Sequence, residues 1–543
     1  MISGTIDLHV HAGKDRVPRK MTIEQAAYAA LNAGMKAVVF KSHITSTADA
    51  VNEANSNLGV NIAYPALVLN KHCGFDPEYV KREVEKGVRI IHMPTIDSLN
   101  HDPEDGLTII DSGGLKDDVI SILKIIAEKE VVLTTGHLTE SEVEDLVYEA
   151  HNRGIRKVVI LHPDIEVSNL SLNFQKRLRG RGVYIERTFY SCIHPHFPNG
   201  ESDKLVSEEG QSYSKKSFAR IAHNIRETGV ENNILTTDLG QPENLDPTSG
   251  FDFFIRKLKG EGFTQSEIDV MTKINPAKLL GLYDYFVKEY VKHEVKVEAE
   301  GLTTTYREPV VGFASAENPL FPELKRIVRE THRLPTDFLD NAKTVVSLFI
   351  PFSKEVVESN HSGKHTSRQW AVGYVETNKI LDDVCMKVAE EFNDLGFKGV
   401  GIKTTHHLSH DRKSHYELSE LYSDWSQRHV AYICGVGTFG LNNLLITEKG
   451  CAGRIGSVIL DVEINPSRKI EVEYCLSKRG VECVECVENC PSGALTIEGF
   501  DREKCMRYLV EQREYQEKRY GFMEGCKACG KCATKIPCDL RIP

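Results

Sequence analysis

The sequence of 543 residues has no apolar run approaching the roughly 20 residues that a membrane helix needs. Its first residues show no charged segment followed by an apolar one, so no secretory signal is expected. Positive charge is not in excess either, because 67 Lys and Arg stand against 78 Asp and Glu. These absences argue against a membrane protein, a secreted protein and a general nucleic-acid binder. We therefore expect a cytoplasmic protein that does not bind nucleic acid or membranes.

The order of apolar segments predicts an α/β protein with two or three domains. Residues 1–283 alternate strand-like runs with amphipathic helical stretches, which is typical of a (β/α)₈ barrel. A charged stretch at 284–300 is interpreted as a linker. An α/β domain is expected over 301–470 and a small cysteine-rich module over 471–543. The expected barrel strands are 5–10, 37–41, 61–69, 88–92, 131–135, 157–161, 182–186 and 233–237.

Cysteine is concentrated at one end of the chain. Nine of the 14 cysteines fall between residues 475 and 543. In a reducing compartment such a concentration favours metal binding over disulfides. The nine residues are Cys475, Cys483, Cys486, Cys490, Cys505, Cys526, Cys529, Cys532 and Cys538.

The spacing of these cysteines predicts two [4Fe–4S] clusters. One group reads C-x-x-C-x-x-x-C-P over 483–491, and a second reads C-x-x-C-x-x-C over 526–532. Ferredoxin-like two-cluster modules use such groups, in which the cysteine before the proline reaches the other cluster. Paired C-x-x-C groups also occur in zinc ribbons, but the Cys-Pro pair favours iron–sulfur.

The second half of the chain resembles the epoxyqueuosine reductase family over about residues 305–540. The resemblance is carried by the cysteine tail and by segments that read EPVVGFASAENPL (308–320), AKTVVSLFIPF (342–352), GVGTFG (435–440) and GRIGSV (453–458). It implies one cluster with the ligands Cys490, Cys505, Cys526 and Cys529. The other would take Cys483, Cys486 and Cys532, with Cys475 or Cys538 as fourth ligand, because Gly480 stands where the family has a cysteine.

The same resemblance implies cobalamin as the reductant of a substrate, with the clusters supplying its electrons. An external donor such as ferredoxin or flavodoxin would then be a partner. The family's catalytic acid is an aspartate, for which Asp424 is the nearest candidate. His429 and Tyr422 are alternatives for the proton transfer, and Asp424 is otherwise interpreted as a helix cap. Queuosine itself is not expected as substrate, because residues 1–283 have no place in that chemistry.

Histidines follow several of the expected barrel strands. His9 and His11 lie two residues apart on the first strand, so both side chains face the same side. His137, His162 and Asp238 come at later strand ends, where active sites of such barrels lie. A single histidine there would usually be a core residue, but five such side chains favour a divalent metal, most simply zinc. A metal of this kind lowers the pKa of bound water to about 7.

This order of residues, together with NPAKLLGL at 275–282, resembles the amidohydrolase superfamily over residues 1–283. The resemblance implies that His9, His11, His137 and His162 are metal ligands, with Asp238 as both ligand and general base. A bridging Lys or Glu is expected at the fourth strand, where this chain has His92. The most similar branch is uncharacterised and carries the same Lys-Ser-His segment, here 41–43.

Two further side chains of the barrel are candidates. Lys41, which shares its strand end with His43, is predicted either to orient a substrate carboxylate or to be a modified ligand. Glu186 ends the seventh strand and is a weaker candidate, since it could simply pair with Arg187 or a neighbouring lysine.

The leading functional hypothesis is a bifunctional enzyme. Its barrel would hydrolyse a small molecule with a cyclic C–N bond, and its second half would carry out an iron–sulfur and cobalamin-dependent reduction. The alternative is a hydrolase barrel with a tail that only transfers electrons. A third hypothesis, a barrel that binds without hydrolysis, is disfavoured by the complete set of five candidate ligands.

Overall fold

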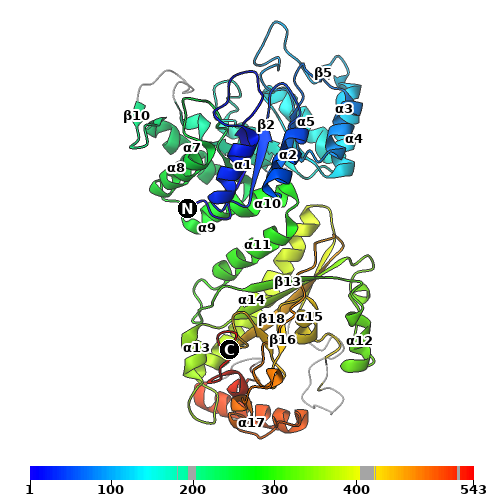
Figure 1. Ribbon diagram of the computed structural model, residues 1–543, viewed down its shortest axis with the longest axis vertical. Coiled ribbons are helices and arrows are strands. Elements are labelled where there is room, and N and C mark those ends of the chain that lie inside the picture. The colour runs from blue at the N-terminus through cyan, green and yellow to red at the C-terminus, as the bar shows by residue number, and fades with distance from the viewer. Residues whose placement is uncertain (180–181, 194–203, 404–420, 422, 522–525, 527) are drawn as a thin grey trace. The chain divides into compact units, whose positions relative to one another are not determined.

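The computed structural model describes residues 1–179, 182–193, 204–403, 421, 423–521, 526 and 528–543 (Figure 1). The chain divides into two compact units, Met1–Phe286 and Val287–Pro543. Among the helices in these described ranges, none is both long and apolar enough to cross a bilayer.

The first unit is an eight-stranded parallel barrel, as the sequence predicts. Hydrogen bonds from the His11 amide to the Leu239 carbonyl and from the Asp238 amide to the His9 carbonyl, both 2.8 Å, close the ring. The strands follow chain order around the barrel: β1 (Ile6–His11), β2 (Ala37–Lys41), β3 (Ala63–Val68), β4 (Ile90–His92), β7 (Val132–Thr134), β8 (Val158–Ile160), β9 (Tyr184–Thr188) and β12 (Asn233–Thr236).

Helices alternate with these strands because apolar residues recur at helical spacing and polar residues cap the first turns. Thr22 and Gln25 form a capping box at the start of one helix, and Thr139 and Glu142 do so at another. In Figure 1 the two blue helices α1 and α2 lie beside β2. The helices are α1 (Ile23–Asn32), α2 (Ala48–Leu58), α3 (Pro77–Glu85), α4 (Asp117–Lys129), α5 (Glu140–Asn152), α6 (Leu172–Arg179), α7 (Lys215–Thr228), α8 (Pro247–Gly260), α9 (Gln265–Asp269) and α10 (Asn275–Leu280).

Two short hairpins extend from the barrel, β5 (Ile110–Asp111) with β6 (Gly114–Leu115) and β10 (Lys204–Val206) with β11 (Ser212–Ser214). Strand β1 is buried along its whole length, as parallel strands covered on both faces are. The functional side chains therefore emerge only where the strands end.

The second unit is built on a four-stranded antiparallel sheet in the order β13-β14-β18-β15. The long helix α14 (Arg368–Asp394) packs against β15 and β18. The strands are β13 (Val310–Ser315), β14 (Thr344–Pro351), β15 (Gly399–Ile402) and β18 (Gly453–Leu460), with a separate hairpin of β16 (Gly437–Phe439) and β17 (Leu445–Thr447). The other helices are α12 (Leu320–Ile327), α13 (Lys354–Ser359), α15 (Gln427–Ile433), α16 (Glu485–Glu488) and α17 (Arg502–Tyr520).

The segment predicted as a linker is helical. Helix α11 (Tyr283–Glu298) covers most of residues 284–300, and the boundary between the units falls within it, after Phe286. Its charged side chains are paired, as in the contact of Lys292 with Glu289 at 3.0 Å. The prediction of a linker without secondary structure is therefore wrong. The helix was not recognised because its apolar residues show no strong helical period.

The cysteine-rich tail belongs to the compact second unit. Cys475 and Cys486 pack in one apolar cluster with Phe352 and Trp370. The described residues of the tail form helices and 3₁₀ turns, with one isolated bridge between Leu495 and Phe500 and no named strand. The paired strands of a ferredoxin-like module are therefore not seen in this part of the chain.

Candidate metal centre and cysteine sites

Two histidines of β1 share one carboxylate oxygen at the mouth of the barrel. Nε2 of His9 and Nε2 of His11 each lie 3.2 Å from Oδ1 of Asp238. Donor atoms about 2.0–2.2 Å from one zinc ion stand about 3.0–3.6 Å apart. Burial alone would raise the pKa of Asp238, but His9 and His11 hold it well below its usual value. The carboxylate is thus ionised, and these three groups suit a divalent ion.

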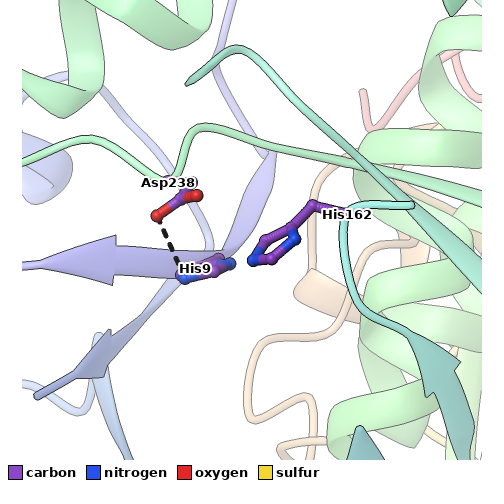
Figure 2. Close-up of side chains that lie close together, drawn as sticks. All are labelled: His9, His162 and Asp238. Carbon is purple, nitrogen blue, oxygen red and sulfur yellow. Dashed lines mark ion pairs between the residues drawn. The ribbon is translucent and has the colours of Figure 1, made fainter. Parts of the chain in front are cut away.

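His162 reaches the same place from the end of β8. Figure 2 shows its ring directed toward His9, and the two ring centroids are 5.7 Å apart. His9, His162 and Asp238 each offer a ligand atom within 4.8 Å of the others. His137 follows β7, and its ring centroid lies 4.9 Å from that of His162. The structure therefore gathers all five predicted ligands at one end of the barrel.

Glu186 fixes the orientation of His9. Its Oε1 lies 3.1 Å from Nδ1 of His9 and accepts a hydrogen bond from Thr236 at 2.9 Å. A carboxylate on one ring nitrogen leaves the other ring nitrogen free to bind metal. Of the two pairings that the sequence left open for Glu186, the one with Arg187 is not formed, because Arg187 pairs with Asp164 at 2.7 Å.

Asp15 holds the rings of His11 and His43 by contacts with their Nδ1 atoms, as Glu186 does with His9. The sequence did not point to Asp15 as a residue of the site. Its carboxylate lies 3.1 Å from Nδ1 of His11 and 3.1 Å from Nδ1 of His43. Arg19 Nη2 lies 2.5 Å from Asp15 Oδ2, 3.1 Å from His11 Nδ1 and 3.2 Å from His43 Nδ1. His11, Asp15 and His43 also satisfy the spacing of a metal site. Because a guanidinium already lies against all three, we interpret them as an outer layer that orients His11.

Lys41 points into the same centre. Its Nζ lies 3.0 Å from Nε2 of His9, and the residue is 1% exposed. Burial lowers the pKa of this amine. A buried lysine beside a candidate metal ligand is compatible with both predicted roles, which are orienting a substrate carboxylate and serving as a modified metal ligand.

Four cysteines of the tail line one pocket. They are Cys475, Cys483, Cys486 and Cys538. Four thiolates around one centre are what a [4Fe–4S] cluster requires. Both candidates for the fourth ligand thus lie in this pocket, together with the C-x-x-C pair.

Cys526 and Cys532 have different surroundings. Burial raises the pKa of Cys532, and so do four neighbouring thiols, those of Cys529, Cys505, Cys490 and Cys486. Cys526 instead donates from Sγ to Gln516 Oε1 at 2.7 Å, on helix α17. The division of these cysteines between two clusters stays a prediction.

Asp424 is engaged with neighbouring side chains. Its Oδ1 accepts a hydrogen bond from Thr331 at 2.6 Å and lies 3.2 Å from Nη1 of Arg329. It caps no helix, because the N-cap of α15 is Ser426. Ser426 Oγ also lies 2.7 Å from Nδ1 of His429, whose pKa burial lowers to about 4. Tyr422, the other alternative, lies outside the described residues.

The chain is similar to known proteins of two kinds. Residues 4–186 match a family of unknown function, DUF6282. The epoxyqueuosine reductase of Bacillus anthracis is 33% identical over 130 residues, which are 23% of this chain and 32% of that protein. That of Bacillus subtilis is 26% identical over 204 residues, which are 36% and 48%. The chain therefore spans about a third to a half of the length of these curated relatives.

Solved structures of both kinds also match. An amidohydrolase from Pseudomonas aeruginosa matches with a TM-score of 0.39 and 14% identity, covering 51% of this chain and 95% of that one. The epoxyqueuosine reductase of Streptococcus thermophilus matches with a TM-score of 0.29 and 18% identity, covering 46% and 67%. The similarity of part of the chain to epoxyqueuosine reductases agrees with the resemblance found in the sequence of the second half.

Proposed function

We propose that the chain is an enzyme with two separate sites. Its barrel hydrolyses a small molecule, most simply one with a cyclic C–N bond, with the help of a divalent metal. Its second unit carries two [4Fe–4S] clusters that deliver electrons from an external donor. The observation that carries the hydrolase proposal is the approach of His9 Nε2 and His11 Nε2 to the same oxygen of Asp238, at 3.2 Å each.

The residues of the barrel would hold the metal and handle the proton. His9, His11, His137, His162 and Asp238 supply the ligand atoms. A divalent ion, when bound there, supplies Lewis-acid activation of water and of the substrate carbonyl. Asp238, ionised and at the mouth, accepts the proton of the attacking water.

Lys41 would act beside the metal. A bound cation at His9 would repel a lysine ammonium 3.0 Å from the same nitrogen. Lys41 is therefore either a neutral amine or a modified lysine in the metal-bound enzyme, or it turns toward a substrate carboxylate. Substitution by Met keeps its length and removes both the charge and the nucleophilic nitrogen, so the metal content of K41M separates these roles. Loss of metal indicates a ligand, and a raised KM with intact metal indicates substrate binding.

In the second unit we assign one cluster to Cys475, Cys483, Cys486 and Cys538, which line the pocket. The other cluster would take Cys490, Cys505, Cys529 and Cys532, since the thiols of Cys490 and Cys505 raise the pKa of both Cys529 and Cys532. This assignment uses the pair Cys483/Cys486 for one cluster and the pair Cys529/Cys532 for the other, and it leaves Cys526 outside both. Such clusters transfer single electrons and perform no hydrolysis.

The contacts of Asp424 favour a second candidate for this unit, a module that transfers electrons without a catalytic site of its own. A catalytic acid must be able to reach the substrate. Oδ1 of Asp424 is instead engaged by Arg329 at 3.2 Å and by the hydroxyl of Thr331 at 2.6 Å. Cobalamin-dependent reduction, the first candidate, is supported by the similarity to epoxyqueuosine reductases.

One experiment tests the proposed hydrolysis and asks whether it is independent of the iron–sulfur clusters. The full chain is purified anaerobically and assayed against cyclic amides, imides and imines, alongside its Asp238→Asn variant. We expect hydrolysis by the wild-type chain and none by the variant, with equal iron contents. A variant that hydrolyses as well as the wild-type chain would contradict the proposal.

Detection of cobalt decides between the two candidates for the second unit. Protein produced with cobalamin is analysed for bound cobalt after gel filtration. About one cobalt per chain supports the reductase, and iron without cobalt supports electron transfer alone.

A further inference from the structure

The candidate ligand His162 has an unusual backbone conformation. Its φ is 22°, a positive value that is uncommon outside glycine. It also precedes Pro163, and a proline restricts the backbone of the residue before it. Such conformations cost free energy and persist only where the surrounding structure holds them in place. The groups that hold this turn therefore decide where the His162 ring lies.

Glu186 of β9 holds the first residue of the turn. Its Oε2 accepts a hydrogen bond from the amide of His162 at 3.2 Å. Its Oε1 lies 3.1 Å from Nδ1 of His9. One carboxylate thus contacts two of the candidate metal ligands and fixes the turn where it leaves β8.

Asp164, two residues after His162, holds the other end of the turn. Its Oδ2 accepts a hydrogen bond from Nη1 of Arg187 at 2.7 Å, and its Oδ1 accepts one from Nδ2 of Asn224 on α7 at 2.7 Å. Arg187 follows Glu186 in β9, and successive side chains of a strand point to opposite faces. The two neighbours in β9 therefore hold the same turn from opposite faces of one strand.

The ion pair between Arg187 and Asp164 is deeply buried, since their side chains are 0% and 2% exposed. The guanidinium also donates from Nε to Asn233 at 2.8 Å and from Nη2 to Thr228 at 3.2 Å. Burial removes the water around both charges, and apolar residues of similar size often stabilise a fold equally well. Stability alone therefore does not account for this pair, whereas its place beside the His162 turn gives it a role.

We propose that Asp164 is a positioning residue for metal binding by His162. Its pair with Arg187 ties the turn to β9 and keeps the imidazole in the group that His162 forms with His9 and Asp238. Metal affinity then depends on an ion pair that lies outside the ligand set. This inference rests on the proposed metal-dependent hydrolase.

The test measures the affinity of the anaerobically purified full chain for Zn²⁺ by competition with a chelator. Weaker binding by Asp238→Asn identifies the barrel as the site that is measured. The double variant Asp164→Leu with Arg187→Met removes both charges together, so neither is left buried and unpaired. We expect it to keep the iron content and the urea midpoint of the wild-type chain. It should bind Zn²⁺ at least about 10-fold more weakly, as when other outer partners of ligating histidines are lost.

Thr228→Val is the matched control, because it removes a hydrogen bond from the same guanidinium and leaves the contact with Asp164. It should bind Zn²⁺ with the affinity of the wild-type chain. If the double variant does not fold, Asn224→Ala takes its place, since it removes the other contact of the Asp164 carboxylate. This variant should also bind Zn²⁺ more weakly than the control.

The outcomes separate this inference from the proposed hydrolase. Wild-type affinity in the double variant, or in Asn224→Ala where that variant is used, would overturn the role of Asp164 and leave the hydrolase intact. An equal loss of affinity in Thr228→Val would overturn it as well, because the whole buried network would then matter only for stability. A wild-type chain whose barrel binds no Zn²⁺ would overturn the proposed hydrolase itself.

Discussion

Oδ1 of Asp238 lies 3.2 Å from Nε2 of His11, although one residue follows the last barrel strand and the other ends the first. Closure of the barrel brings them together, because the Asp238 amide donates to the His9 carbonyl at 2.8 Å. Asp238 has a backbone φ of 53°, a left-handed conformation that is uncommon outside glycine.

Replacement of Asp238 by Asn should abolish hydrolysis and leave the iron–sulfur clusters intact. The amide cannot accept the proton of water, and it is a weaker metal ligand than the carboxylate. Loss of a general base alone costs about 10²–10⁴-fold in rate. Hydrolysis rate and the absorbance of the clusters near 400 nm are measured on the same sample. Loss of the absorbance together with activity would contradict the independence of the two sites.

Replacement of Asp15 by Asn should weaken metal binding without abolishing it. Asp15 orients His11 through Nδ1 at 3.1 Å and does not face the ion. The expected loss is about 10–100-fold in metal affinity, as for other outer partners of ligating histidines. Asp105→Asn is the control, since that side chain is 88% exposed. An affinity of Asp15→Asn equal to that of the control would argue against this role.

The two outer cysteines of the C-x-x-C-x-x-C group, Cys526 and Cys532, allow the cluster assignment to be tested with one matched pair of variants. Cys532→Ser should lose about half of the iron, because it removes a thiolate from one of two four-iron clusters. Cys526→Ser should keep all of the iron, because Cys526 Sγ donates a hydrogen bond to Gln516 and is not assigned to a cluster. Iron per chain is measured on anaerobically purified protein. The opposite pattern would restore the assignment that the sequence predicts.

The fourth ligand of the other cluster is tested in the same way. Cys475 lines the pocket with Cys483, Cys486 and Cys538, whereas Cys451 lies outside this lining. We expect Cys475→Ser to lose about half of the iron and Cys451→Ser to retain it. Iron loss confined to Cys451→Ser would transfer the ligand role from Cys475 to Cys451.

Replacement of Asp424 by Asn should affect stability more than electron transfer. The buried carboxylate accepts a hydrogen bond from Thr331 and pairs with Arg329, so its loss should lower the free energy of unfolding by about 1–3 kcal/mol. Anaerobic urea unfolding measures this change, and reduction of the clusters by dithionite should be unaltered. Normal stability with complete loss of substrate reduction would instead identify Asp424 as a catalytic acid.

The barrel and the gathering of its five candidate ligands at one end could be predicted from sequence because the strand ends of a parallel barrel converge. Two of the signals are local in sequence, namely the spacing of His9 and His11 and the position of Asp238 after a strand. They do not depend on how the side chains of the core pack. Asp15 could not be found in this way, because it lies in a loop after β1 and its role depends on the placement of Arg19.

The cysteine groups could be recognised from spacing, but spacing alone does not decide their division between two clusters. Spacing tells which thiols share a turn and leaves open which distant thiol completes each centre. Cys526 and Cys532 are distinguished only by the contact of Cys526 with Gln516 on helix α17. The helix over the predicted linker was missed for a related reason, since charged pairs such as Lys292 with Glu289 leave little apolar period.

The most direct test of the account is the metal content of the anaerobically purified chain, compared with that of Asp238→Asn. We predict about eight iron atoms per chain in both proteins, from two four-iron clusters, and a further divalent metal that the variant binds more weakly. A wild-type chain that holds iron but no other divalent metal, even after dialysis against Zn²⁺ or Mn²⁺, would contradict a metal-dependent barrel.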